Sequence, residues 1–310
     1  MTTACSIVRL RVGRRPLLVA AAVSLAALVP SVVGLLADGQ VIAGAPAWLK
    51  PAKFAISIAV YCATLSWLLS LVQGHRRVIR VVGWLTGAAL IAELVLIDIQ
   101  VLRGTTSHFT TSTSTDSLIL VSMGGLVGVV FLAALVTAGL LVRQRGLPTP
   151  LATGVRAGLG VSILGMAEAV LMITNGTYHP GGGHTVGAPD DGPGLPLTGW
   201  STQHGDLRVA HFVGLHALQV LPALAVLLHR YGAALEPLTQ TRLVRTVAVG
   251  YAGLVALLTW QAERGLPLLH PDPAVVAVVA VGTAGAALIA GTALVLLRPT
   301  VTGPGLTRSA

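Results

Sequence analysis

Apolar runs of about 20 residues recur from one end of this chain to the other. A helix rises about 1.5 Å per residue, so each run is long enough to cross about 30 Å of hydrocarbon. Inside a bilayer every backbone polar group must be hydrogen-bonded within the protein, which requires these runs to be helical. Alternating ten-residue segments, which are typical of a membrane β-barrel, are absent. The sequence therefore predicts an all-α, polytopic transmembrane bundle of about eight helices.

The boundaries of the apolar runs give the expected helices. The predicted spans are residues 17–37, 53–73, 80–102, 118–142, 154–174, 208–229, 244–262 and 273–297. The first run follows a basic segment and could instead be a signal peptide. Its apolar stretch is longer than a usual signal core and no small-x-small cleavage site follows closely, so a retained helix is expected. The expected organisation is a basic tail over 1–16, one transmembrane domain over 17–297 and a second tail over 298–310.

Composition excludes the other interpretations of a basic chain. The net charge is +9, but charged residues make up only 10% of the sequence, against about 25% in an ordinary soluble domain. The arginines stand in short groups between apolar runs and form no continuous basic face, so a nucleic-acid partner is not expected. Cys5 and Cys62 give no disulfide framework, since one lies in the basic tail and the other inside an apolar run.

The positions of the basic residues predict the orientation of the bundle. Of the 20 Lys and Arg residues, 15 fall in the two tails and in the connections after the second, fourth and sixth helices. The other five are Lys50, Lys53, Arg103, Arg208 and Arg264. Cytoplasmic connections carry the excess of positive charge, so both termini are expected in the cytoplasm and the protein in the cell membrane.

The two long connections on the expected outer side differ from the short basic ones. Residues 103–117 are rich in Ser and Thr. Residues 175–207 are rich in Gly and Pro and contain His179, His184, His204 and Trp200. Long loops in compact proteins often form lids or binding loops, and the apolar side chains of this one favour an ordered lid.

Polar side chains inside the apolar runs are costly and mark function by default. At 1.5 Å per residue, Asp98 lies roughly 6 Å, Glu168 roughly 9 Å, His216 roughly 12 Å and Glu93 roughly 14 Å below the outer edge. The inner half of the bundle has almost no such residues. The matched depths predict one polar cavity that opens outward and is roofed by the histidine-rich loop.

Acid–base chemistry is the activity that these groups suit best. A carboxyl group in an apolar site can stay protonated near neutral pH and act as a proton donor. We expect Asp98 to be the donor, with Glu93 or Glu168 tuning it and His216 as a fourth catalytic candidate. The residues expected to contact the substrate are Gln100, His211, Gln219, Trp260, Gln261 and Trp200. The alternative is a purely structural role. Glu93 or Asp98 would then pair with Lys53 or an arginine, and Glu168 would be hydrogen-bonded between helices.

Cofactor sites have weaker support. His216 and His229 are spaced as in proteins that hold two haems, but no second helix carries matching histidines. A single zinc or iron ion held by His211, His216 and a carboxylate is possible, although the close histidine pairs of strong metal sites are missing. No cofactor is predicted.

The acids Glu93, Asp98 and Glu168, together with the helical architecture, resemble the small integral-membrane terpene cyclases of fungi and actinobacteria. That resemblance implies protonation of an alkene or epoxide in a prenyl, terpenoid or other lipid substrate. The stretch Trp48-Leu49-Lys50-Pro51-x-Lys53-Phe54 is similar to uncharacterised bacterial multi-pass membrane proteins and implies no activity. Aromatic residues, at 4% of the chain, are few for carbocation chemistry.

Two other classes of function stay open. Buried acids and histidines also build the proton relays of transporters, although an apolar inner half argues against a site near the midplane. A receptor, scaffold or redox protein could instead use the outer loop for binding. The oligomeric state does not follow from the sequence.

Overall fold

The computed structural model describes residues 15–176, 181–232, 235–282 and 285. Residues 1–270 and 271–310 form two compact units. The first unit holds seven long helices: α1 (Arg15–Ala37), α2 (Leu49–Leu71), α3 (Arg76–Leu102), α4 (Ser114–Arg143), α5 (Thr149–Thr174), α6 (Leu207–Tyr231) and α7 (Pro237–Glu263). In the second unit an apolar helix spans Pro273–Gly282. The all-α prediction with about eight helices is confirmed.

Some sequence expectations fall outside the described residues. They concern Cys5 and His179, the basic residues Arg9, Arg11, Arg14, Arg298 and Arg308 of the tails, and residues 283–284 and 286–297 of the last predicted helix. Cys62 lies buried in α2.

The helices of the first unit overlap the predicted spans but begin earlier in the sequence. α2 begins at Leu49 and not at residue 53, and α7 begins at Pro237 and not at residue 244. The apolar runs mark only the part of each helix that faces hydrocarbon, whereas the helices continue into polar sequence. At α4 the added turn has a cap: the backbone N–H of Asp116 donates to Oγ1 of Thr113 at 3.1 Å.

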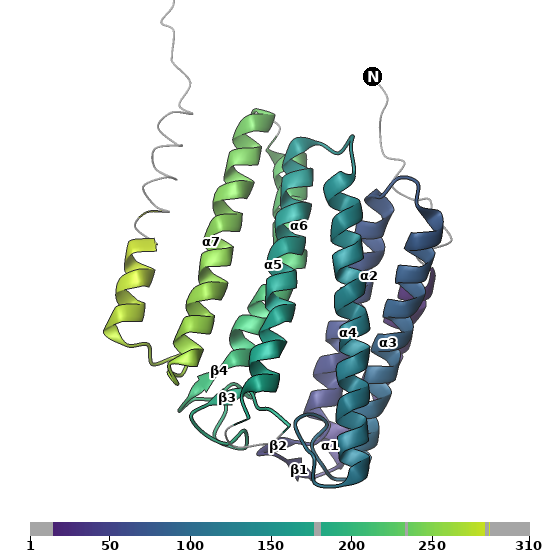
Figure 1. The fold of residues 1–310 in the computed structure, drawn as a ribbon, viewed down its shortest axis with the longest axis vertical. Helices are drawn as coiled ribbons and strands as arrows, with labels where there is room; N and C mark the ends of the chain where they lie inside the picture. The colour runs from purple at the N-terminus through teal and green to yellow at the C-terminus, as the bar shows by residue number, and fades with distance from the viewer. Residues whose placement is uncertain (1–14, 177–180, 233–234, 283–284, 286–310) are drawn as a thin grey trace, which may run out of the picture. The chain divides into compact units, whose positions relative to one another are not determined.

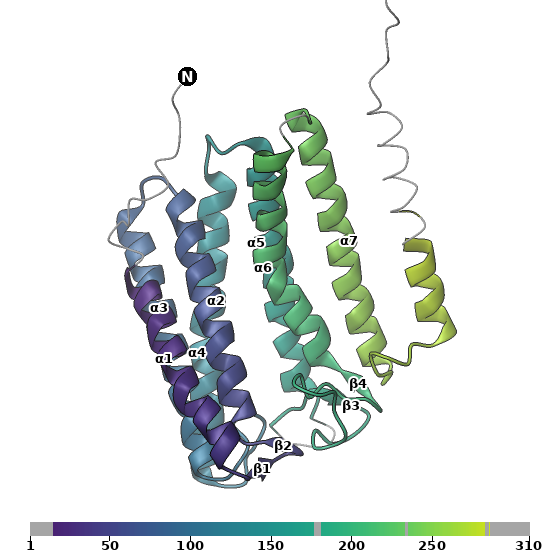
Figure 2. The same ribbon diagram turned by 180° about the vertical axis from the view of Figure 1, so that it is seen from behind.

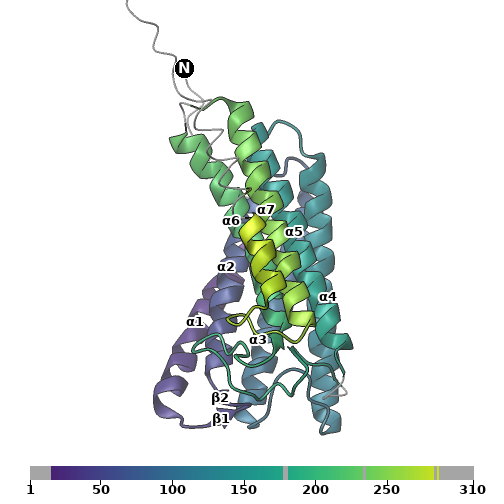
Figure 3. The same ribbon diagram turned by 90° about the vertical axis from the view of Figure 1, so that its left-hand side faces the viewer.

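Two groups of neighbours make up the seven-helix unit. α1, α2, α3 and α4 form one group, and α5, α6 and α7 form the second. The two groups meet between α4 and α5 and between α2 and the pair α5 and α6. Figures 1 and 2 show the helices running side by side, with the loops that carry the short strands gathered at one end. Figure 3 shows the same loops at the same end from the side. We call this the loop end and the opposite one the Arg-rich end, because Arg76, Arg77 and Arg143 lie there.

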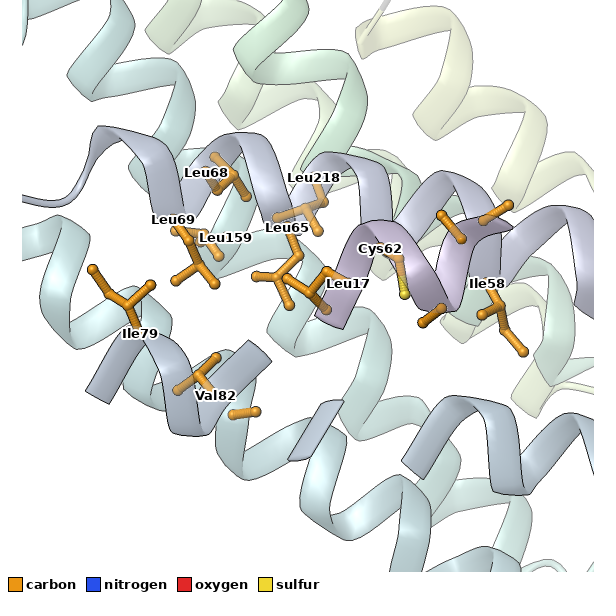
Figure 4. Packing of buried hydrophobic residues seen from close by; sticks show 14 of the residues in the cluster. Leu17, Ile58, Cys62, Leu65, Leu68, Leu69, Ile79, Val82, Leu159 and Leu218 are labelled. Atoms are coloured by element: carbon orange, nitrogen blue, oxygen red, sulfur yellow. The ribbon is translucent and has the colours of Figure 1, made fainter. Parts of the chain in front are cut away.

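The largest apolar cluster joins the two groups. Its centre is α2, whose Cys62, Leu65 and Leu68 are almost fully buried. Leu159 of α5 and Leu218 of α6 belong to the same cluster (Figure 4). Many other apolar side chains stay exposed, as lipid-facing side chains would be.

Glycines allow α5 and α6 to approach each other very closely. A Cβ placed on Gly165 would lie 2.6 Å from the carbonyl carbon of Gly214, and one on Gly214 would lie 2.6 Å from Cα of Gly165. A Cβ placed on Gly158 would lie 2.8 Å from the carbonyl oxygen of Ala217. Small residues at such crossings let the backbones of membrane helices meet.

Short strands and side-chain bonds fix the loops at the loop end. β1 (Val41–Ile42) pairs with β2 (Ala45–Pro46), and β3 (Thr185–Val186) pairs with β4 (Gly205–Asp206), both antiparallel. Nε1 of Trp48 donates to Oδ2 of Asp38 at 2.8 Å, which ties the start of α2 to the end of α1. This bond, followed by one from the backbone of Gln40, lowers the pKa of Asp38.

Candidate functional site

A buried carboxyl group and an imidazole face each other near the loop end. Glu93 of α3 is only 3% exposed, and Nε2 of His108 lies 3.5 Å from its Oε1. His108 belongs to the loop that follows α3. Both carboxylate oxygens of Glu93 are buried, and within the described part of the chain neither accepts a hydrogen bond. A buried acid of this kind is costly, and it is therefore a strong candidate for a functional group.

Aromatic rings hold His108 in place. Its ring centroid lies 5.8 Å from that of Phe54 on α2 and 6.0 Å from that of Phe109. Phe109 has a φ of 61°, a left-handed conformation that is unfavourable for a bulky residue. Nδ1 of His108 lies 3.0 Å from Oγ of Ser107, so either atom can be the donor. The loop thus holds the ring with Nε2 toward Glu93.

The surroundings of His108 favour its neutral form. Burial, and then the positive charges of Lys50 and of two neighbouring histidines, His184 and His211, hold the pKa of His108 well below its usual value near 6.5. A neutral imidazole can accept a proton at one nitrogen while it carries one on the other. Because His108 lies next to a carboxyl group, a proton can move between the two side chains.

Basic side chains of α2 complete this site. Lys50 is half-buried and interacts electrostatically with Glu93, Asp190 and Arg208. One turn further on, Nζ of Lys53 donates to the carbonyl oxygen of Thr198 at 3.1 Å. The stretch from Trp48 to Phe54 therefore contributes three features. Trp48 anchors the start of α2, Lys50 and Lys53 supply amines, and the ring of Phe54 packs on His108.

The long loop closes over the same region through an ionic network. Asp206, the N-cap of α6, accepts from Arg208 Nη2 at 2.6 Å and from the backbone of Ser201 at 2.8 Å. Burial alone would raise the pKa of Asp206, but its bonds with Arg208 and the charges of Arg208 and His184 lower it overall. Asp190 accepts from the backbone N–H groups of His184 and Thr185.

His184 connects this network to the rings of Phe54, His108 and Phe109. Its Nδ1 lies 3.3 Å from Oδ1 of Asp190, and its ring packs edge-on against Phe109 at 6.4 Å. Burial and then the charge of Arg208 lower the pKa of His184 to about 4, although Asp190 and Asp206 act in the opposite direction.

His211 lies near His108 with a defined tautomer. Its Nδ1 is 2.7 Å from the carbonyl oxygen of Gly165, which can only accept, so Nδ1 carries the proton. In the neutral ring Nε2 then carries the lone pair and can accept a hydrogen bond or a proton. Since His211 acts electrostatically on His108, it belongs to the same region.

The structure divides the predicted catalytic residues among different partners. Glu168 accepts a bond from Oγ1 of Thr259 on α7 at 2.7 Å, as the alternative of a bond between helices predicted. Asp98 is half-buried as a whole. Its Oδ1 atom is buried and has no hydrogen-bond partner among the described residues. His216 is exposed and donates to Gln219, which bonds to Thr64 of α2. Only Glu93 lies in the cluster around His108, and a single cavity shared by all four stays a prediction.

The other predicted substrate-contacting residues mostly bind the chain itself. Gln100 is buried, donates to Asp116 and accepts from Arg103. Gln261 is buried and donates to the carbonyl oxygen of Pro267 at 2.7 Å. Trp200 is half-buried, with its carbonyl oxygen bonded to the backbone of Leu195. Trp260 is exposed, and the Arg264 guanidinium lies 4.7 Å from its ring centroid.

Metal binding has no support within the described ranges. There, no three His, Cys, Asp or Glu side chains converge closely enough to hold an ion. His211 and His216 have different partners, Gly165 and Gln219. The possible single metal ion is therefore still only a prediction.

The helices define the class of protein. Seven of them, among the residues described, are long and apolar enough to cross a bilayer, so the chain is a multi-pass membrane protein. Comparison with known proteins gives no match to any family model, curated protein or solved structure.

Proposed function

We propose that the protein is an integral membrane enzyme that moves protons on a lipophilic substrate, with Glu93 and His108 as its acid–base pair. The single observation that carries this proposal is the 3.5 Å distance between Nε2 of His108 and Oε1 of Glu93, a buried carboxyl group that accepts no hydrogen bond from the described residues. An acid beside a base with an available lone pair is the usual arrangement for proton transfer.

The pair suits an isomerisation or cyclisation. In such a reaction one proton is added to the substrate and another is removed, so no further reactant is consumed. Glu93 donates the first proton, and the neutral His108 accepts the second. The proton then returns from Nε2 of His108 to Glu93 across the short gap between them, which restores the starting state.

The position of Glu93 favours a substrate that resides in the membrane. Glu93 lies nine residues before the end of α3, so it is roughly 14 Å along the helix axis from that end. A prenyl, terpenoid or other lipid chain can reach such a depth directly from the bilayer. By the distribution of basic residues, the protein would lie in the cell membrane with the loop end outward and both termini in the cytoplasm.

The test begins with an extract of lipids from the native membrane. The purified wild-type protein should convert at least one component, detected by mass spectrometry as a product of unchanged mass. Glu93→Gln should lower that turnover by roughly 10²–10⁴-fold, because the amide keeps the size of the side chain but cannot donate the proton. Glu236→Gln, at an exposed position in the connection before α7, is the matched control and should retain full turnover.

Asp98→Asn separates this proposal from the sequence-based one. If Asp98 were the donor and Glu93 only tuned it, Asp98→Asn would lose more turnover than Glu93→Gln. We expect the opposite order. If the wild type converts no component of the extract, the enzyme proposal fails as a whole.

A further inference from the structure

A groove of about 500 Å³ lies at the Arg-rich end, far along α4 from the site described above. Its walls are mainly the apolar side chains of Leu135, Val136 and Leu140 on α4. His75, which precedes α3, and Arg143, the last residue of α4, also line it. Oε1 of Gln144 accepts from the backbone N–H of Gln73 at 2.9 Å, which fixes the connection before α3 against the end of α4.

The groove has a polar and an apolar part at different depths. Eight helical positions separate Leu135 from Arg143, which corresponds to about 12 Å along the axis. With 30 residues, α4 is about 45 Å long and exceeds the hydrocarbon thickness. We therefore expect its last residue, the charged Arg143, at the level of the lipid headgroups. Leu135 and Val136 are exposed. They lie about two helical turns before Arg143, so we expect them at the level of the acyl chains.

Charge at the mouth of the groove is all of one sign. Residues 72–80 and 135–150 contain five arginines and no Asp or Glu. Arg76, Arg77 and Arg143 are exposed. The hydrogen bond described for the Arg143 side chain is a long one, 3.3 Å from Nη1 to the carbonyl oxygen of Gly139 in its own helix. The guanidinium can therefore turn toward a phosphate without breaking a strong interaction.

We propose that this groove binds one anionic phospholipid, with the phosphate on Arg143 and an acyl chain along Leu135 and Val136. Basic pockets between transmembrane helices are suited to anionic headgroups, and the apolar wall suits the chain that such a headgroup carries. A free phosphate would use only the mouth of the groove. The site is independent of the proposed enzyme activity.

Native mass spectrometry of the full-length protein in detergent tests this directly. The probes are phosphatidylglycerol and phosphatidylcholine with the same dioleoyl chains. The wild type should retain one phosphatidylglycerol at a concentration at which phosphatidylcholine is mostly lost. Arg143→Ala should lower phosphatidylglycerol retention about tenfold, to the level of phosphatidylcholine, a change equivalent to 1.4 kcal/mol. Arg145→Ala, at an exposed arginine two residues further on that does not line the groove, should retain it.

Two more measurements distinguish binding in the groove from nonspecific attraction of the lipid to basic residues. Gly139→Leu should fill the groove and lower retention without removing a charge, because Gly139 lines it and has room for a side chain beside Arg143. Millimolar inorganic phosphate should not displace the lipid. Equal retention of the two lipids by the wild type, equal losses in Arg143→Ala and Arg145→Ala, or displacement by phosphate alone would overturn the proposal.

Discussion

Nε2 of His108, in the loop after α3, lies 3.5 Å from Oε1 of Glu93, which is buried inside that helix. The loop thus folds back to bring an imidazole to a carboxyl group that accepts no hydrogen bond from any described residue. Phe54 and Phe109 hold the ring there, and the described part of the long loop covers the same end through His184, Asp190 and Asp206.

The orientation of the bundle gives the first prediction. Because the sequence predicts 15 of the 20 basic residues on one side of the membrane, reporter fusions after Arg77, Arg145 and Arg242 should read cytoplasmic. Fusions near Ser112 and Gly192 should read extracytoplasmic. A single connection on the opposite side would refute this topology.

The crossing of α5 and α6 gives the second prediction. Gly165→Ala should lower the free energy of unfolding by about 1–3 kcal/mol, because the added methyl group meets the backbone of Gly214. Gly160→Ala is the control in the same helix, with nothing within 4 Å of the new Cβ, and should be neutral or stabilising by up to about 1 kcal/mol. Thermal unfolding in detergent compares the two variants. Equal effects would show that the crossing is looser than described.

The third prediction concerns the stability of the folded protein at low pH. In the unfolded chain His184 has a pKa near 6.5, whereas burial and Arg208 lower it to about 4 in the folded protein. Between these values the unfolded state takes up a proton that the folded state does not, so stability must fall as the pH drops from 6.5 toward 4. Limited proteolysis of the loop should therefore be faster at pH 4.5 than at pH 7.

A matched pair of variants checks the source of that acid sensitivity. His184→Gln should reduce the difference between the two pH values, since its side chain does not titrate. His270→Gln, at an exposed histidine beyond α7, should leave the difference unchanged. If His184→Gln behaves like His270→Gln, the acid sensitivity has another origin.

The helices could be predicted because each apolar run is itself long enough to cross a membrane. Their starts could not, because Lys50 and Lys53 lie in the first turns of α2 and the hydropathy of such turns resembles that of a loop. Glu93 was identified as a carboxylate in an apolar run. His108 was missed because it lies in a Ser- and Thr-rich connection, where no helical periodicity indicates which side chain turns inward.

The side-chain partners that the acids find on neighbouring elements could not be predicted from the sequence either. The matched depths of Glu93 and Glu168 suggested a common site, but depth does not give the face of a helix or its neighbours. Glu168 faces Thr259 of α7, whereas Glu93 faces the loop beside α2. Their rotational positions depend on packing, including the close contact at Gly165 and Gly214.

The most direct test of the account is a double-mutant cycle on turnover of the lipid substrate. Glu93→Gln and His108→Asn should each lower turnover by roughly 10²–10⁴-fold. Because residues that act as a unit are strongly non-additive, the double variant should be no slower than the slower single variant. Losses that multiply in the double variant, or full turnover in either single variant, would contradict the claim that Glu93 and His108 form one acid–base pair.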